Sequence, residues 1–75
     1  MPEYMNLGGD SGVAFYEISP NSITVQFSDG AVYLYTYASA GPAAIEQMKF
    51  LARTGEGLNS YINRYVKYGY EARLR

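Results

Sequence analysis

The chain has 75 residues, 48% of them hydrophobic and 16% aromatic, and it contains neither cysteine nor histidine. Its length predicts one small domain, and its apolar content excludes a disordered chain. The missing residue types exclude a disulfide framework and a thiolate metal site, and they remove the commonest general base and metal ligand.

The net charge of −1 conceals a strong asymmetry along the chain. All six basic residues lie at Lys49 or after it, whereas five of the seven acidic residues precede it. Summed charge bears on partners and association more than on fold. The asymmetry therefore indicates either an anion-binding C-terminal part or a head-to-tail contact between copies of the chain.

No apolar run approaches the ~18 residues of a membrane span. The N-terminus, Met1-Pro2-Glu3, lacks the basic region that begins a signal peptide. We therefore expect a soluble cytoplasmic protein with no membrane partner.

The first half of the chain predicts strands. Residues 1–12 contain three glycines and little periodicity, which predicts a flexible lead-in to a single domain over residues 13–75. Alternating apolar residues then predict three strands joined by two short turns: Val13–Ile18, Ile23–Phe27 and Ala31–Tyr37. Strands joined by such short turns form an antiparallel meander.

The second half predicts helices. Pro42 suits the first position of a helix, and apolar residues at helical spacing then define the segments Pro42–Thr54 and Leu58–Tyr68, each followed by a glycine. The tail, Tyr70–Arg75, is either an edge strand or an extended strap. We expect an α+β fold of order β-β-β-α-α, with both helices on one face of the sheet. The core is expected to contain Ile23, Val25, Phe27, Ile45, Met48, Leu51, Leu58 and Ile62.

One turn decides which face Tyr33 and Tyr35 take. A two-residue turn at Asp29-Gly30 places both tyrosines on the open face of the sheet. A type I turn with a glycine bulge pairs Val25 with Tyr33 and places them under the helices. A one-residue slip inverts every side chain, and the local sequence is compatible with both turns.

Two groups of residues are candidates for ligand binding. Tyr33 and Tyr35 form an aromatic pair of the kind on which some RNA-binding modules stack bases, although tyrosine also fills small cores. In the second group, Gly57 precedes a helix whose free amides favour an anion, and the helix carries polar donors on its outer face: Asn59, Asn63, Arg64 and Lys67. The alternative for these helix residues is a plain solvated face.

Phe50 lies opposite the apolar stripe of its predicted helix. A lone exposed aromatic is common, but a contact between copies would supply burial that so small a chain lacks. This is the basis for expecting a homo-oligomer as an alternative.

Catalysis has little support in the sequence. It contains no Ser-His-Asp set, no paired-carboxylate spacing, no metal cluster and no P-loop. We expect a protein that is not an enzyme and that uses no cofactor and no metal.

The chain resembles the KTSC domain family from about Val13 to the C-terminus. The resemblance rests on the segment Gly30–Tyr35 with its central Tyr-x-Tyr, on the segment Gly57–Ile62, and on the tyrosine-rich C-terminal segment. That family occurs at the C-terminus of some lysyl-tRNA synthetases and as free-standing small bacterial and phage proteins, and RNA binding is the role usually suggested for it. Two departures are the apolar Leu34 between the tyrosines and the long Ala38–Gly41 link. The family's tolerance of a polar residue between the tyrosines favours the bulged turn.

The leading hypothesis is a small non-catalytic module that binds RNA or a nucleotide. Because non-specific affinity for RNA comes largely from neutralising phosphates, a sequence pI of about 5.1 favours a compact nucleotide. The alternative is a protein-interaction or self-assembling module, in which the acidic part of one copy meets the basic part of another.

Overall fold

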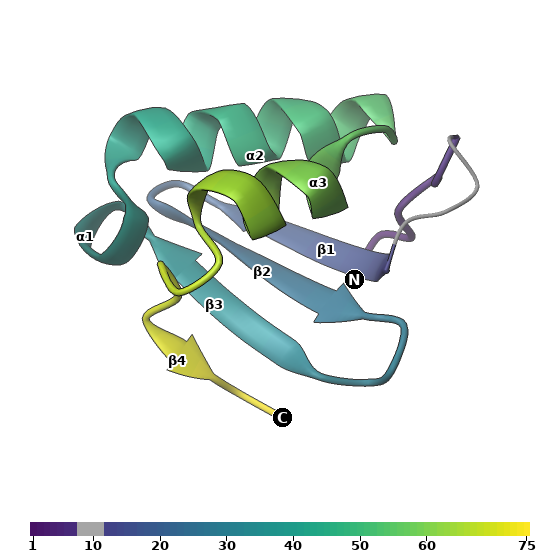
Figure 1. The fold of residues 1–75 in the computed structure, drawn as a ribbon, viewed down its shortest axis with the longest axis horizontal. Coiled ribbons are helices and arrows are strands. Elements are labelled where there is room, and N and C mark those ends of the chain that lie inside the picture. Colours follow the sequence, from purple (N-terminus) through teal and green to yellow (C-terminus); the bar gives the residue numbers. More distant parts are fainter. Residues whose placement is uncertain (8–11) are drawn as a thin grey trace.

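The computed structural model describes residues 1–7 and 12–75 and contains a four-stranded antiparallel sheet covered on one face by helices (Figure 1). The strands are β1 (Val13–Ser19), β2 (Ser22–Phe27), β3 (Val32–Thr36) and β4 (Ala72–Arg73), in that spatial order. The helices are α1 (Tyr37–Ala40), α2 (Pro42–Thr54) and α3 (Leu58–Tyr65). The α+β class, the meander and the placement of α2 and α3 on one face are confirmed.

The turn between β2 and β3 is the bulged one. The amide of Gly30 donates to the carbonyl of Phe27 at 2.9 Å, and the Phe27 amide donates to Ala31 at 2.8 Å. Gly30 has a φ of 95°, which favours glycine. Val25 therefore pairs with Tyr33, so both tyrosines of β3 lie on the face covered by the helices. Val32 takes the opposite face and is buried there.

Helix α2 has the bounds that its sequence predicts. Pro42 begins it, and Gly55 ends it in the left-handed conformation, with a φ of 79°. A Cβ on Gly55 would lie 2.7 Å from the Cβ of Met5, so this position needs glycine for space as well as for conformation.

Two elements differ from the expectation, and the tail takes one of the two forms expected for it. Helix α3 ends at Tyr65 rather than Tyr68, because Val66 leaves the helix and is buried in the core. The link after β3 forms the one-turn helix α1, in which Thr36 and Ser39 cap each other's backbone. Of the edge strand and the extended strap expected for the tail, the structure has the edge strand, β4, which pairs with β3 at Tyr33 and Leu34.

The described part of the expected flexible lead-in packs against the domain. Glu3 bridges Phe15 on β1, and Tyr4 is only 3% exposed. The Tyr4 hydroxyl accepts a hydrogen bond from the Leu58 amide at 3.2 Å, at the start of α3. The segment therefore covers the free edge of β1 and contributes to the core. Residues 8–11 of the expected lead-in, including Gly8 and Gly9, lie outside the described residues.

The core lies between the sheet and the two long helices. Six of its expected members are buried: Ile23, Val25, Ile45, Met48, Leu58 and Ile62. Phe27 and Leu51 are only partly buried and pack against this cluster. The core also contains residues that were not expected in it: Tyr4, Val13, Tyr35, Ala52 and Val66.

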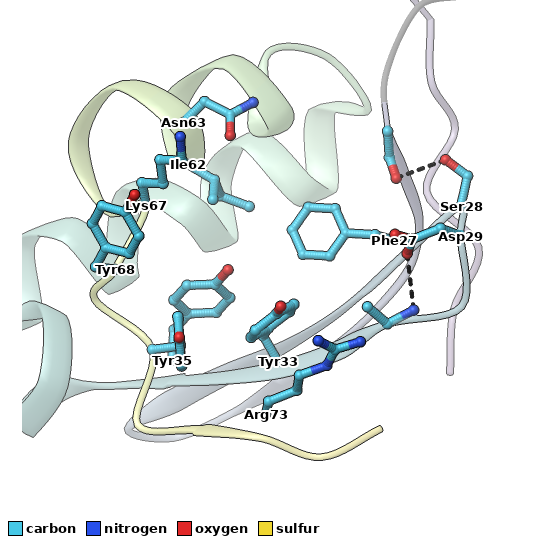
Figure 2. A pocket seen from close by; sticks show the side chains of 13 residues that line it. Phe27, Ser28, Asp29, Tyr33, Tyr35, Ile62, Asn63, Lys67, Tyr68 and Arg73 are labelled. Carbon is cyan, nitrogen blue, oxygen red and sulfur yellow. Dashed lines mark hydrogen bonds between the residues drawn. The ribbon is translucent and has the colours of Figure 1, made fainter.

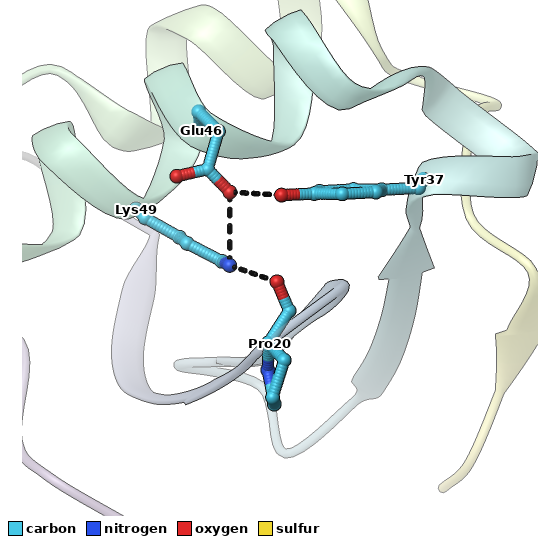
Figure 3. Close-up of polar contacts among 4 residues, drawn as sticks. All are labelled: Pro20, Tyr37, Glu46 and Lys49. Atoms are coloured by element: carbon cyan, nitrogen blue, oxygen red, sulfur yellow. Dashed lines mark hydrogen bonds and ion pairs between the residues drawn. The ribbon is translucent and has the colours of Figure 1, made fainter.

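A buried lysine joins α2 to the β1–β2 turn (Figure 3). Lys49 is 4% exposed, and its Nζ donates to the Pro20 carbonyl at 2.9 Å and to Glu46 Oε2 at 3.0 Å. The Tyr37 hydroxyl donates to the same carboxylate oxygen at 2.6 Å. The hydrogen bond from Tyr37, and then that from Lys49, lowers the pKa of the Glu46 carboxyl. One of the six basic residues is thus part of the packing and is not available to a ligand.

Candidate functional site

A cleft of about 480 Å³ opens between the C-terminal half of α3 and the edge of the sheet formed by β3 and β4 (Figure 2). We call it the aromatic cleft, because five ring side chains line it. It is lined by Gly12, Phe27, Ser28, Asp29, Ala31, Tyr33, Tyr35, Ile62, Asn63, Lys67, Tyr68, Tyr70 and Arg73. The volume lies within the range of ordinary small-molecule sites.

Tyr33 is at the centre of the aromatic contacts. Its ring centroid lies 4.8 Å from that of Tyr70 and 5.7 Å from that of Phe27, the latter pair edge to face. The Arg73 guanidinium lies 5.5 Å from the Tyr33 centroid, in cation–π range. The strand register explains this contact, since Tyr33 and Arg73 are direct partners across β3 and β4.

Tyr35 forms the floor of the cleft. The residue is 2% exposed, yet its hydroxyl points into the cleft (Figure 2). Burial, with the neighbouring Tyr33 and Tyr70 adding to it, raises the pKa of this phenol to about 12. The hydroxyl is protonated at neutral pH, as that of any tyrosine is, and no described residue forms a hydrogen bond with it. It presents a hydrogen-bond donor to whatever enters the cleft.

The charges around the cleft favour an anion. Lys67 and Arg73 both line it, and within the described part of the chain neither pairs with a side-chain carboxylate, although the Arg73 Nε donates to the Arg75 carbonyl oxygen at 3.0 Å. Asp29, the one carboxylate among the described residues of the lining, accepts a hydrogen bond from the Ala31 amide at 3.0 Å and thereby holds the turn. The cleft thus combines stacking surface, the Tyr35 hydroxyl donor and two cations that pair with no described side-chain carboxylate.

The other side of α3 borders a second hollow of about 790 Å³. We call it the α2–α3 hollow. Its lining residues are Gln47, Leu51, Gly57, Ser60, Tyr61, Asn63, Arg64 and Tyr65. Asn63 is common to both hollows.

The predicted site residues are therefore divided. Four of the seven line the aromatic cleft: Tyr33, Tyr35, Asn63 and Lys67. Gly57 and Arg64 line the α2–α3 hollow, and Asn59 is in neither lining but lies against Gly12. The sequence predicts one row of donors on the outer face of this helix. In the structure these residues are divided between two hollows, because α3 separates them.

The expected anion position at the start of α3 is partly occupied. Gly57 adopts a φ of 86° there, as the chain turns into the helix. The Leu58 amide that follows donates to the hydroxyl of Tyr4, so this amide is not free for an anion. The sequence reading overlooked this contact because it spans 54 residues of the chain.

Sequence reasoning also missed several residues of the cleft, chiefly Phe27, Tyr68, Tyr70 and Arg73. For the tail residues a signal was present. A tail paired as an edge strand beside β3 brings its aromatic and basic side chains next to Tyr33. Phe27 was assigned to the core alone, whereas its ring also forms a wall of the cleft.

Comparison of the chain with protein-family models, curated proteins and solved structures found no match. The resemblance to the KTSC domain therefore stays a prediction. No helix among the described residues is long and apolar enough to cross a membrane.

Proposed function

We propose that this protein is a small non-catalytic binding module whose ligand is a nucleotide held in the aromatic cleft. The observation that carries the proposal is the convergence of aromatic rings, the Tyr35 donor and the cations Lys67 and Arg73 on one cleft. A nucleobase stacks on aromatic faces and a phosphate pairs with cations, so a nucleotide uses both features. A cytoplasmic location is part of the same proposal.

The charge distribution supports a compact or short ligand over a long duplex. The chain has six basic residues and a pI of about 5.1, and Lys49 is buried against Glu46 and Pro20. A long duplex requires many phosphate contacts for its affinity. Two cations at one cleft are sufficient for a single phosphate group.

Titration calorimetry with adenosine 5′-monophosphate tests the proposal. Replacing Lys67 or Arg73 with glutamine should weaken binding about two- to fivefold, the value of a solvent-exposed ion pair. Tyr70→Leu should weaken it by about fivefold or more, because it removes a stacking surface. Arg64→Gln is the matched control: it removes an exposed cation from the same helix region but outside the cleft, and it should leave the affinity unchanged.

Two results would contradict this function. One is the absence of any heat of binding for the nucleotide with the folded wild-type protein. The other is a Lys67→Gln, Arg73→Gln double variant that is folded, by circular dichroism, and binds as tightly as the wild type.

A self-assembling module is the second candidate, and the exposure of Phe50 favours it. This side chain is 57% exposed on α2 and lies outside both hollows. A mass measurement in solution separates the two candidates. Self-assembly requires a wild-type oligomer that Phe50→Ser shifts toward monomer, whereas a wild type that stays monomeric over the concentration range excludes it.

A further inference from the structure

The two hollows lie on opposite sides of one helix, α3, and share Asn63. Each combines aromatic rings with a cation. In the aromatic cleft these are the tyrosines around Tyr33 together with Lys67 and Arg73.

The α2–α3 hollow repeats this chemistry. The rings of Tyr61 and Tyr65 lie 4.9 Å apart between centroids, at an angle of 40°, and Tyr65 is 66% exposed. Arg64 lies in the same lining and forms no ion pair with any residue that the structure describes. An exposed ring beside an unpaired guanidinium offers a stacking face and a phosphate contact.

The separation of the two hollows sets a minimum length for a ligand that occupies both. An α-helix with its side chains is about 10–12 Å across, so a ligand that reaches both hollows must pass over the outer side of α3. A single nucleotide that fills the aromatic cleft does not extend that far. A ligand with two bases and a phosphate between them matches the rings and cations that the two hollows present.

We propose that the ligand is a single-stranded oligonucleotide of at least two nucleotides, which crosses α3 at Asn63 and places one base in each hollow. This inference rests on the proposed function and extends it from a nucleotide to a short strand. The strand is single because bases can stack on protein rings only when they are free of their own helix. Asn63, at the helix side of the aromatic cleft, is the residue that would contact the sugar–phosphate link.

The test compares adenosine 5′-monophosphate with oligoadenylates of two and four nucleotides at one salt concentration. For the wild type, the dinucleotide should bind at least about fivefold more tightly than the mononucleotide, the low end of the value of one stacked base. Tyr65→Leu and Arg64→Gln should abolish or reduce this gain and leave the affinity for the mononucleotide within about twofold. Phe50→Leu is the matched control, because it alters an exposed ring on α2 that is not part of either lining. Circular dichroism of each variant verifies the fold.

The outcomes separate this inference from the function on which it rests. Equal affinity for the mononucleotide and the oligonucleotides overturns the two-hollow path and leaves the nucleotide site intact. A length gain that persists in both Tyr65→Leu and Arg64→Gln also overturns it, because the strand then takes another route. Failure of every probe to bind removes the proposed function and this inference together.

Discussion

Tyr4 provides the sharpest test of the fold, because the sequence assigns it to a flexible lead-in and the structure assigns it to the core. Its side chain is 3% exposed and belongs to the main apolar cluster. Its hydroxyl accepts a hydrogen bond from the Leu58 amide, a buried group at the start of α3. Two substitutions separate these contributions: Tyr4→Phe removes the hydroxyl, and Tyr4→Ala removes the ring as well.

The expected losses follow from the contacts. Tyr4→Phe leaves a buried amide without its acceptor, which costs about 1–3 kcal/mol. Tyr4→Ala also leaves a cavity, and truncations of this size in a core cost about 3–5 kcal/mol. At ~0.05–0.15 kcal/mol per residue, a chain of this length has a total stability of roughly 4–11 kcal/mol. The alanine variant should therefore lose a large part of the stability.

Thermal and denaturant unfolding, followed by circular dichroism, measures these losses. Each 1 kcal/mol lowers the melting temperature of a domain of this size by about 4–8 °C. Leu7→Ala is the control, since it alters a side chain of the same segment that is 61% exposed, and it should change stability by no more than about 0.5 kcal/mol. If Tyr4→Ala melts like Leu7→Ala, the N-terminal segment does not pack on the domain and the argument is refuted.

Three further predictions concern other parts of the fold. Lys49→Met should lower the free energy of unfolding by about 1–2 kcal/mol, because it removes hydrogen bonds from a charged donor. In the same denaturation experiment, the control Arg53→Met, on the exposed side of α2, should change the free energy of unfolding by no more than about 0.5 kcal/mol. Ile62→Ala should cost about 2–5 kcal/mol, and Leu51→Ala should cost less because Leu51 is only partly buried; equal losses in urea unfolding would show that the packing is misassigned. The folded-state pKa of Tyr35 is raised from 10.0 to about 12, so the unfolded chain releases this proton first as pH rises. The free energy of unfolding should therefore fall as pH rises through that window. Denaturation curves at alkaline pH should show a smaller fall for Tyr35→Phe.

Local patterns in the sequence were sufficient for most elements. The alternation of apolar residues located β1 to β3 to within a residue or so. Proline at one end and glycine at the other gave both bounds of α2. These signals are local, since strand period and helix caps depend on neighbouring residues alone.

Only some residues of the candidate site could be predicted from the sequence. Tyr33, Tyr35 and Lys67 were identified from residue type and spacing, and they do line one cleft. Arg64 was grouped with Lys67 because both belong to one polar helix surface, but the bodies of α2 and α3 place Arg64 in the other hollow. The partners from the tail became visible only once β4 was paired with β3.

The sequence by itself determined the α+β class, the meander and the amphipathic faces of two helices, because each of these follows from periodicity over fewer than twenty residues. The tertiary structure decided the rest. The bulge at Gly30 set which face Tyr33 takes, although the local sequence is compatible with either turn. Burial of Val66 ended α3 early, and the hydroxyl of Tyr4 reached an amide 54 residues away. Such contacts depend on which surfaces pack together when the chain folds, and local sequence patterns do not specify these long-range contacts.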